Sequence, residues 1–326
     1  MKGQIISSFN LTTAPFRGLL LEKSEKIWLD GQFVPWHEAN VHVLTHTLHY
    51  GFGVFEGIRC YQTSKKKSIV FRLPEHVDRL FDSATILGID IPFAKDEIFA
   101  AILSVVRENR LEECYIRPIV FLGHNKMGLN PNGVDVRVAI AAWPWGTYLG
   151  DDALNKGIRV HISSFIRHHV NITMTRAKAC GYYINSILAK AEAVQDGYDE
   201  AILLDPNGFV SEGSGENIFL FSKGKLSTPS LSCSNLDGIT RDAVFQICKD
   251  LKIDIEERCI TRDELYIADE IFLTGTAAEI TPVREVDNRV IGTGKRGKVT
   301  EKIQETFFDT VRGNNAKYKK WLTEVK

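Results

Sequence analysis

The sequence predicts a two-domain protein of mixed α/β and α+β architecture. The chain has 326 residues, 44% of them hydrophobic, which suffices for two domains with buried cores. The first half is rich in short apolar strand patterns, whereas the second half alternates strand and helix patterns. We expect a smaller N-terminal α+β domain (1–142), an interdomain loop (143–153) and a larger C-terminal domain (154–326).

Strands and two helices are predicted for the first half. An Asp-Gly turn between two apolar runs is typical of a hairpin. The helix that Pro74 opens has apolar side chains at the spacing of one buried face, and Gly88 ends it. In order, the predicted elements are the hairpin over 26–35, strands over 54–61 and 68–73, helices over 74–87 and 95–109, and strands over 114–122 and 134–142.

Residues 143–150 contain Gly and Pro, which interrupt regular structure. Their aromatic side chains Trp143, Trp145 and Tyr148 suggest a linker that lines a cleft. Beyond it we predict strands over 157–163, 200–204, 209–210 and 271–274, and helices over 181–195, from 239 onward and over 300–311. A polar tail is expected after the last helix.

The composition excludes several classes of partner. The formal net charge is −1, so there is no electrostatic basis for binding nucleic acid or an anionic membrane. The basic runs 65–67 and 317–320 are expected to be a solvated loop and tail. No apolar run reaches the roughly 20 residues of a membrane span. Residues 1–18 lack the apolar stretch and cleavage site of a signal peptide. We therefore expect a cytoplasmic protein.

Neither cysteines nor histidines predict a metal site. The six cysteines are widely spread without a C-x-x-C pair, which is typical of reduced thiols. Cys180 is either a reactive thiol or, as we expect, a small space-filling residue. His42, His46 and His49 would share one helical face, but no carboxylate accompanies them as in H-E-x-x-H. Packing and hydrogen bonding are their expected roles.

Two segments carry candidate chemical groups. Lys178 lies among small residues in T-R-A-K-A-C-G-Y-Y. Burial there would depress its pKa and free a nucleophilic amine, although most lysines are simply solvated. Glu212 and Glu216 lie among glycines in S-E-G-S-G-E-N. A carboxylate at such a place could pair with a cationic ligand nitrogen, and the alternative is a turn with two exposed acids.

Two further segments suit anions. Leu236–Asp242 opens a helix, and the free N–H groups of a helix start bind phosphate. Ordinary capping is the commoner explanation of such a segment. Leu273–Glu279 is a strand end that enters a turn of small residues, which also suits backbone contacts with an anion.

In this order, and together with Phe55-Glu-Gly-Ile-Arg59 and Tyr115-Ile-Arg117, these segments resemble the branched-chain amino acid aminotransferases. These are pyridoxal 5′-phosphate enzymes of fold type IV, in the class IV aminotransferase family, with a fold like that of D-amino acid aminotransferase. The resemblance runs from about residue 26 to residue 308. It implies ping-pong transfer of the amino group between L-leucine, L-isoleucine or L-valine and 2-oxoglutarate.

The resemblance also implies roles for residues around the cofactor. Lys178 is the implied catalytic residue, which binds the cofactor covalently and moves a proton between the substrate and the cofactor. Glu212 is implied to pair with the pyridine nitrogen, Tyr183 with the phenolic oxygen and Arg79 with the phosphate. The other implied cofactor-binding residues are Leu236, Ile239, Thr240, Gly275 and Thr276.

For the substrate, the resemblance implies that Tyr115, Thr276 and Ala277 hold the α-carboxylate. It implies an apolar pocket of Phe55, Trp145 and Tyr148, and a partner for the glutamate side chain in Arg117 and the Tyr50 hydroxyl. Ala278 and Leu129 complete the implied substrate-binding set. Tyr50 and the Gly128-Leu129 loop are implied to come from a neighbouring subunit, which makes the protein a homodimer or a higher homo-oligomer.

Several alternatives share this fold. D-amino acid aminotransferases, aminodeoxychorismate lyases and amine transaminases would use the same cofactor, and a catalytically idle cofactor-binding protein is a further possibility. Tyr115-Ile-Arg117 and Trp145 favour the branched-chain enzyme. One departure affects the substrate range, since Cys180 and Tyr182 stand where the family often has glycine and asparagine.

Overall fold

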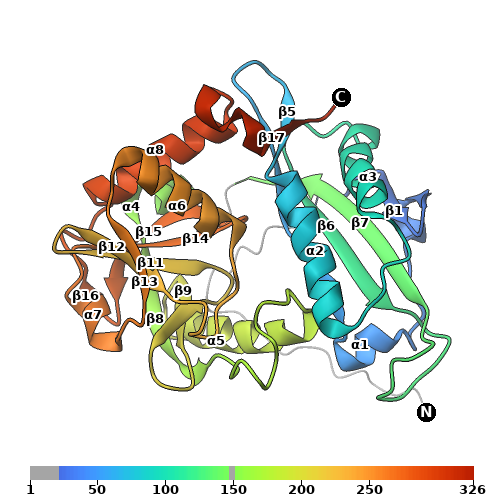
Figure 1. Ribbon diagram of the computed structural model, residues 1–326, viewed down its shortest axis with the longest axis horizontal. Coiled ribbons are helices and arrows are strands. Elements are labelled where there is room, and N and C mark those ends of the chain that lie inside the picture. Colours follow the sequence, from blue (N-terminus) through green and yellow to red (C-terminus); the bar gives the residue numbers. More distant parts are fainter. Residues whose placement is uncertain (1–21, 147–150) are drawn as a thin grey trace, which may run out of the picture.

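The structure, a computed structural model, describes residues 22–146 and 151–326. In these residues two β-sheets lie side by side, with helices packed on each (Figure 1). The first sheet has the strand order β17-β5-β4-β6-β7-β1-β2, and β3 pairs with β6. The second has the order β10-β9-β8-β15-β14-β11-β12-β13, and β16 pairs with β15. The predicted mixed fold is confirmed.

The first sheet is antiparallel and confirms the predicted hairpin, in which β1 pairs with β2. The predicted strand over 54–61 instead divides at Glu56 and Gly57 into two short strands that both pair with β6. The strands of this sheet are β1 (Lys26–Leu29), β2 (Gln32–Pro35), β3 (Gly53–Phe55), β4 (Ile58–Gln62), β5 (Ser68–Phe71), β6 (Cys114–Leu122), β7 (Val136–Pro144) and β17 (Leu322–Glu324).

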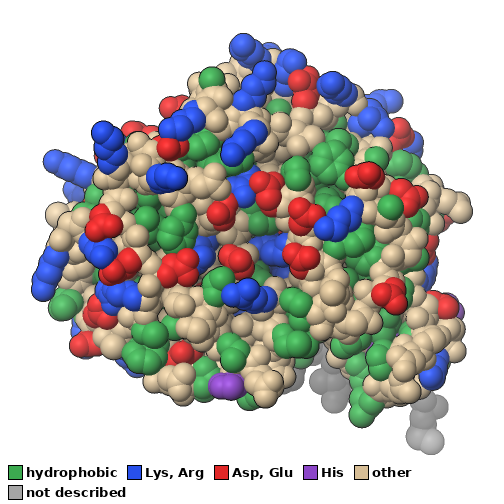
Figure 2. Space-filling view, viewed as in Figure 1, with side chains coloured by type: hydrophobic (Ala, Val, Ile, Leu, Met, Phe, Trp, Pro, Cys, Tyr) green, Lys and Arg blue, Asp and Glu red, His purple; other side chains and the backbone are tan. Residues whose placement is uncertain are grey.

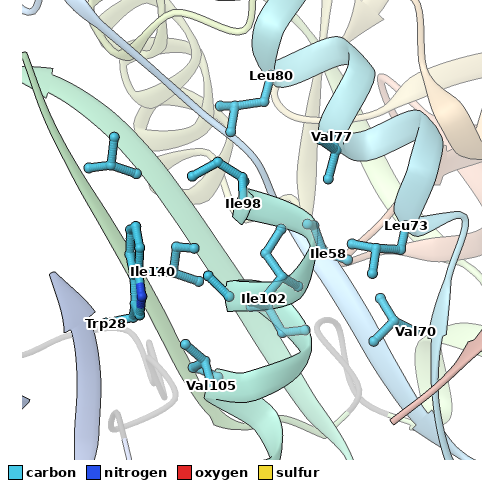
Figure 3. Packing of buried hydrophobic residues seen from close by; sticks show 14 of the residues in the cluster. Trp28, Ile58, Val70, Leu73, Val77, Leu80, Ile98, Ile102, Val105 and Ile140 are labelled. Atoms are coloured by element: carbon cyan, nitrogen blue, oxygen red, sulfur yellow. The ribbon is translucent and has the colours of Figure 1, made fainter. Parts of the chain in front are cut away.

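Helices α2 (Leu73–Leu87) and α3 (Lys95–Glu108) cover one face of the first sheet. Their apolar stripes meet strand residues in a dense core (Figure 3). Gly88 ends α2 in the left-handed conformation, with φ 69°, which glycine adopts at little cost. Both helices agree with the sequence prediction. The short helix α1 (His46–Tyr50) precedes β3.

The second sheet is mixed. It is parallel where β8 meets β9 and β15, and where β12 meets β13. Helix α5 packs on β8 and β9, whereas α6 and α8 pack on β14. The strands are β8 (Ile158–Ile166), β9 (Glu200–Leu204), β10 (Val210–Gly213), β11 (Asn217–Ser222), β12 (Lys225–Pro229), β13 (Ile255–Arg258), β14 (Glu270–Gly275), β15 (Glu279–Val286) and β16 (Arg289–Val290). The helices are α4 (Asp151–Lys156), α5 (Tyr183–Gln195), α6 (Ile239–Leu251), α7 (Arg262–Tyr266) and α8 (Lys298–Val311).

The prediction of a polar C-terminal tail is wrong. Residues 316–321 form a 3-10 helix, and β17 then pairs with β5 of the first sheet. Tyr318 and Trp321 are buried and stack with ring centroids 4.2 Å apart. Because these two rings bury a large apolar area, they hold the lysine-rich segment between them against the core.

The predicted irregular linker begins later than expected. Strand β7 runs through Trp143 to Pro144, and Pro144 lies opposite Cys114 at the strand end, where a missing N–H is tolerated. Tyr148 lies outside the described residues. The domain boundary at 143–153 stays a prediction, and the return of β17 to the first sheet shows that the chain crosses between the two sheets again near its end.

Charges of both signs are interspersed over the face drawn in Figure 2. In residues 22–146 and 151–326, no helix is long and apolar enough to cross a bilayer. The same residues contain no group of three or more His, Cys, Asp or Glu side chains that could hold a metal ion. Buried His46 instead lies with Nε2 2.8 Å from the Gly128 carbonyl oxygen.

Candidate active site

A cavity of about 470 Å³ lies between the two sheets. Both sheets and the starts of α5 and α6 contribute to its wall. Most residues singled out in the sequence meet here, although they come from distant parts of the chain. The predicted residues that line the cavity are Phe55, Arg79, Tyr115, Arg117, Trp145, Lys178, Tyr183, Glu212, Leu236, Ile239, Thr240, Gly275, Thr276 and Ala277.

Lys178 lies on a segment that is tied to the first sheet. Its carbonyl oxygen accepts a hydrogen bond from the Phe55 N–H at 3.1 Å, and its own N–H donates to Ser83 Oγ at 3.0 Å. The Lys178 Nζ donates to the Tyr183 hydroxyl at 2.8 Å. The amine is therefore held in the cavity beside a phenol, within reach of a ligand atom.

Glu212 is a buried carboxylate on β10 and lines the same cavity. One oxygen pairs with Arg167 Nη2 at 2.8 Å, and the other accepts the Leu236 N–H at 3.1 Å. Burial raises the pKa of Glu212, while Arg167 and the Leu236 N–H oppose that rise. A buried carboxylate with a single guanidinium partner can still pair with a cationic ligand nitrogen.

Arg79 projects from α2 toward the start of α6. Its guanidinium forms a two-point pair with the carboxylate of Glu56, at 2.6 and 2.9 Å. A third bond runs from Nη1 to the Asp237 carbonyl oxygen at 2.9 Å. Glu56 also contacts His76 Nδ1 at 2.7 Å. This network fixes the Arg79 guanidinium beside the free N–H groups at the start of α6. The guanidinium and these N–H groups together suit a phosphate.

Glycine at the cap of α6 leaves room for the Asn217 side chain. A Cβ on Gly238 would lie 1.9 Å from Asn217 Oδ1. The helix then begins at Ile239, and the N–H groups of its first turn have no carbonyl partner within the helix. The turn from β14 to β15 brings Thr276 and Ala277 to the same cavity. The backbone of the α6 start and that of the β14–β15 turn therefore both line the same cavity.

Glu216, the second acid of the glycine-rich segment, lines the cavity without adding a full negative charge. Its side chain is buried, and Oε2 accepts the Gly215 N–H at 3.0 Å. Burial, together with the nearby carboxylate of Glu200, raises the pKa of Glu216 to about 8. At neutral pH the group holds a proton, so the cavity can take anions with less repulsion.

The other end of the cavity is aromatic and cationic. Arg117 lies over the Phe55 ring, 4.7 Å from its centroid, and its Nη2 lies 3.4 Å from the Tyr115 hydroxyl. Its Nε is buried without a hydrogen-bond partner among the described residues. A Cβ on Gly57 would lie 1.8 Å from the Tyr115 hydroxyl oxygen, which explains the glycine. This end suits an apolar group or a carboxylate.

Three of the predicted residues that the structure describes do not line this cavity. Tyr50 is 44% exposed and Leu129 is 87% exposed, both on the outer surface of the chain. Ala278 is buried behind the turn, and its carbonyl oxygen accepts the Thr281 hydroxyl at 2.7 Å. Tyr148 lies among residues 147–150, which the structure does not describe.

Sequence reasoning missed three residues that support the site. Arg167, Glu56 and His76 each contact a predicted residue or its partner through a buried polar pair. Glu56 lies inside the F-E-G-I-R motif, so its position offered a signal. Arg167 and His76 lie in segments without a motif, and only the fold brings them to the site.

The arrangement of lysine, phenol, buried carboxylate and anion-binding backbone can be compared with known proteins. A family model described as amino-transferase class IV matches residues 53–286. The chain belongs to the class IV aminotransferase family. A branched-chain-amino-acid aminotransferase of Pseudomonas aeruginosa is 54% identical over 307 residues, covering 94% of this chain and 99% of that protein.

Solved class IV structures agree with this membership. The crystal structure of the Escherichia coli branched-chain amino acid aminotransferase superposes with a TM-score of 0.91 at 47% identity, covering 93% of this chain and 100% of that one. The branched-chain amino acid aminotransferase from Thermobaculum terrenum, in its PLP-bound holo form, gives 0.88 at 34% identity, covering 93% and 99%. The family resemblance drawn from the sequence is confirmed.

Proposed function

We propose that the protein is a branched-chain amino acid transaminase, which uses pyridoxal 5′-phosphate to transfer the amino group between L-leucine, L-isoleucine or L-valine and 2-oxoglutarate. The observation that carries this proposal is the contact between the Lys178 amine and the Tyr183 hydroxyl in a cavity that also holds Glu212. The activity named for the relatives in this family supports it.

The residues present fit the cofactor. Arg79, the first turn of α6 and Thr276 would hold the phosphate, while Tyr183 and Glu212 would face the two polar atoms of the ring. The lysine amine at the centre would hold it covalently. Pyridoxal 5′-phosphate supplies an electron sink for the negative charge that develops on the substrate α-carbon. Glu212 would strengthen that sink by keeping a proton on the ring nitrogen.

Lys178 would also act as the acid and base of the reaction. Its amine, when free, would carry the proton that leaves the substrate α-carbon. Tyr183 lies 2.8 Å from this amine and would keep it oriented. The tie between the Lys178 carbonyl and β3 keeps the backbone in place while the side chain moves.

The substrate would lie between the backbone donors and the aromatic end. The N–H groups of Thr276 and Ala277, with the Tyr115 hydroxyl, would bind the α-carboxylate. Phe55 and Trp145 would bury the branched side chain. For glutamate, the unpaired Nε of Arg117 would meet the side-chain carboxylate. The same end thus accepts both substrates of the ping-pong cycle.

A spectroscopic titration tests the proposed function. The purified protein should show the visible band of a lysine-bound cofactor. L-Leucine should bleach the band and 2-oxoglutarate should restore it, because the amino group passes to the cofactor and then to the second substrate. Bleaching by D-alanine alone would favour a D-amino acid aminotransferase. A bound cofactor that reacts with neither amino acid, or no binding of added pyridoxal 5′-phosphate, would contradict the proposal.

Arg167→Leu should weaken cofactor binding. Without its guanidinium partner, buried Glu212 would take up a proton and pair poorly with a protonated ring nitrogen. We expect the Kd for pyridoxamine 5′-phosphate, which forms no bond with Lys178, to rise by about 10- to 100-fold. Fluorescence titration measures it, and Arg167→Lys should recover part of the affinity. Unchanged binding in Arg167→Leu would show that Glu212 needs no cation.

A homodimer is part of the proposal. Large apolar side chains are exposed on α1 and on the outer face of α5, among them Leu48 at 64%, Ile184 at 65% and Ile187 at 66%. The two helices are neighbours, since the Gly181 N–H donates to the Gly51 carbonyl oxygen at 2.9 Å. Such a surface is typical of a protein interface. It would also bring Tyr50 and Leu129 toward the cavity of a second copy.

Ile187→Asp should weaken self-association, because a two-fold interface would bury the new charge twice. We expect the dimer dissociation constant to rise by at least about tenfold in sedimentation velocity. Ile267→Asp is the matched control, since Ile267 is 72% exposed at the end of α7, which lies across the molecule from α1 (Figure 1). A dimer that tolerates Ile187→Asp but not Ile267→Asp would place the interface elsewhere.

We also propose a cytoplasmic location. All six cysteines are free thiols, and cytoplasmic proteins keep their thiols reduced.

A further inference from the structure

Two cysteines outside the cavity lie against each other. Cys233 is in the loop from β12 to α6, and Cys259 directly follows β13. Their sulfur atoms are 3.7 Å apart, although the residues are 26 positions apart in the chain. The pairing of β12 with β13 brings the two cysteines together. Pro229 and Arg258 form the last pair of the β12–β13 ladder, and the Ser230 N–H donates to the Arg258 carbonyl oxygen at 3.2 Å.

The two thiols differ in accessibility. Cys259 is exposed, whereas Cys233 is 1% exposed directly behind it. Burial raises the pKa of Cys233 to about 11, so this thiol is rarely ionised at neutral pH. A dissolved oxidant therefore meets Cys259 first. A disulfide needs a sulfur separation of about 2.05 Å, so its formation has to close the observed 3.7 Å contact.

The other thiols are shielded from such an oxidant. Cys60, Cys114 and Cys248 are buried, and Cys180 is partly buried in the wall of the cavity. Cys259 is the one exposed thiol in the part of the chain that the structure describes, and it has a second thiol in contact. Selective oxidation at this pair follows from exposure and proximity together.

The Cys233 loop continues directly into the cavity wall. Three residues further on, the Leu236 N–H donates to Glu212 and its carbonyl oxygen accepts from Asn217 at 2.8 Å. The next carbonyl oxygen, of Asp237, accepts from Arg79. A covalent link at Cys233 would therefore restrain the segment that supports both the Glu212 carboxylate and the Arg79 guanidinium.

We propose that Cys259 and Cys233 form a modification site, at which hydrogen peroxide oxidises the two thiols reversibly to a disulfide. This disulfide would restrain the 230–238 loop of the cofactor site. With hydrogen peroxide, the Cys259 thiolate attacks one oxygen and the O–O bond breaks, so that hydroxide leaves. The hydroxide takes up the proton that the thiol had released, and the products are a sulfenic acid and water. Cys233 then attacks the Cys259 sulfur, its proton leaves with the hydroxyl group as a second water, and the S–S bond forms. Two thiols lose two electrons and the peroxide gains them. An external dithiol reverses the reaction by exchange.

Peptide mapping of peroxide-treated holoenzyme tests the site. After hydrogen peroxide and alkylation of the remaining thiols, the non-reduced digest should contain the Cys233 and Cys259 peptides joined within one chain. Dithiothreitol should separate them. Cys259→Ser is the principal variant, since the side chain is exposed and its replacement should not disturb folding. It should abolish the link, whereas Cys180→Ser should leave it intact.

The effect on the loop is measured separately. A bond that closes a loop of this length should raise the melting temperature of the oxidised holoenzyme by a few degrees. Release of cofactor on dilution should slow several-fold, and Cys259→Ser should show neither change. Oxidation of Cys259 to sulfinic acid with Cys233 still alkylatable, or links only between chains, would overturn the modification site. A disulfide that alters neither melting nor cofactor release would overturn the proposed restraint of the loop.

Discussion

Lys178→Ala should abolish transamination and leave a protein that binds pyridoxal 5′-phosphate only non-covalently. Under the proposed function, the substitution removes both the attachment point of the cofactor and the amine that carries the proton. General acid–base catalysis alone contributes up to about 10⁴-fold, so we expect kcat with L-leucine and 2-oxoglutarate to fall by at least about that factor. Borohydride treatment and mass spectrometry should find the cofactor on the Lys178 peptide of the wild type and on no peptide of the variant.

The control for this experiment is another lysine-to-alanine change. Lys156 is exposed on α4, and its ion pair with Asp152 is at the surface, so Lys156→Ala should keep full activity and the covalent cofactor. The residues proposed to bind the phosphate remain in Lys178→Ala, so that variant should still bind the cofactor. A Lys178→Ala variant with turnover near that of the wild type would assign the chemistry to another group, whatever the family membership.

Much of the cavity wall could be predicted because its signals are local. Lys178, Glu212 and Thr276 lie in short segments of small residues, and the need for backbone to approach a ligand explains those small residues. Gly238 is an example of a small residue that close packing requires, since a Cβ there would lie 1.9 Å from Asn217 Oδ1. Helices α2 and α3 could be predicted equally well, because the residues of a buried helix face repeat at a fixed spacing along the chain.

The remaining features depend on contacts between distant segments. Arg167 follows β8 and looks like a solvated arginine in the sequence, yet it is 7% exposed and pairs with Glu212 on β10. The lysines around Trp321 suggested a polar tail, but the buried area of two aromatic rings outweighs charges that can stay in water. Periodicity carries no information about such pairings.

Glu56→Ala should lower the free energy of unfolding more than any surface substitution. It leaves the side chains of Arg79 and His76 without the carboxylate that they contact. Glu56 is fully buried, and the Arg79 side chain is 13% exposed. Removing one partner of a buried pair typically costs about 3–5 kcal/mol in the free energy of unfolding. Urea denaturation of the cofactor-free protein measures it. Glu108→Ala, which removes a surface carboxylate paired with Lys26, should change little.

The difference in unfolding free energy between wild type and Glu56→Ala should depend on pH. This dependence distinguishes the loss of the Glu56 charge from the loss of its packing. Burial alone would raise the pKa of Glu56, but Arg79 and His76 hold the pKa far below its ordinary value of 4.5. A carboxyl whose pKa is lower in the folded state stabilises it fully above the unfolded value, and this contribution is lost as the pH falls below it. The part of the stability gap that the Glu56 carboxylate contributes should therefore be complete well above pH 4.5 and should narrow as the pH falls below that value. A gap that stayed constant to about pH 3 would mean that Glu56 acts through its volume and not through its charge.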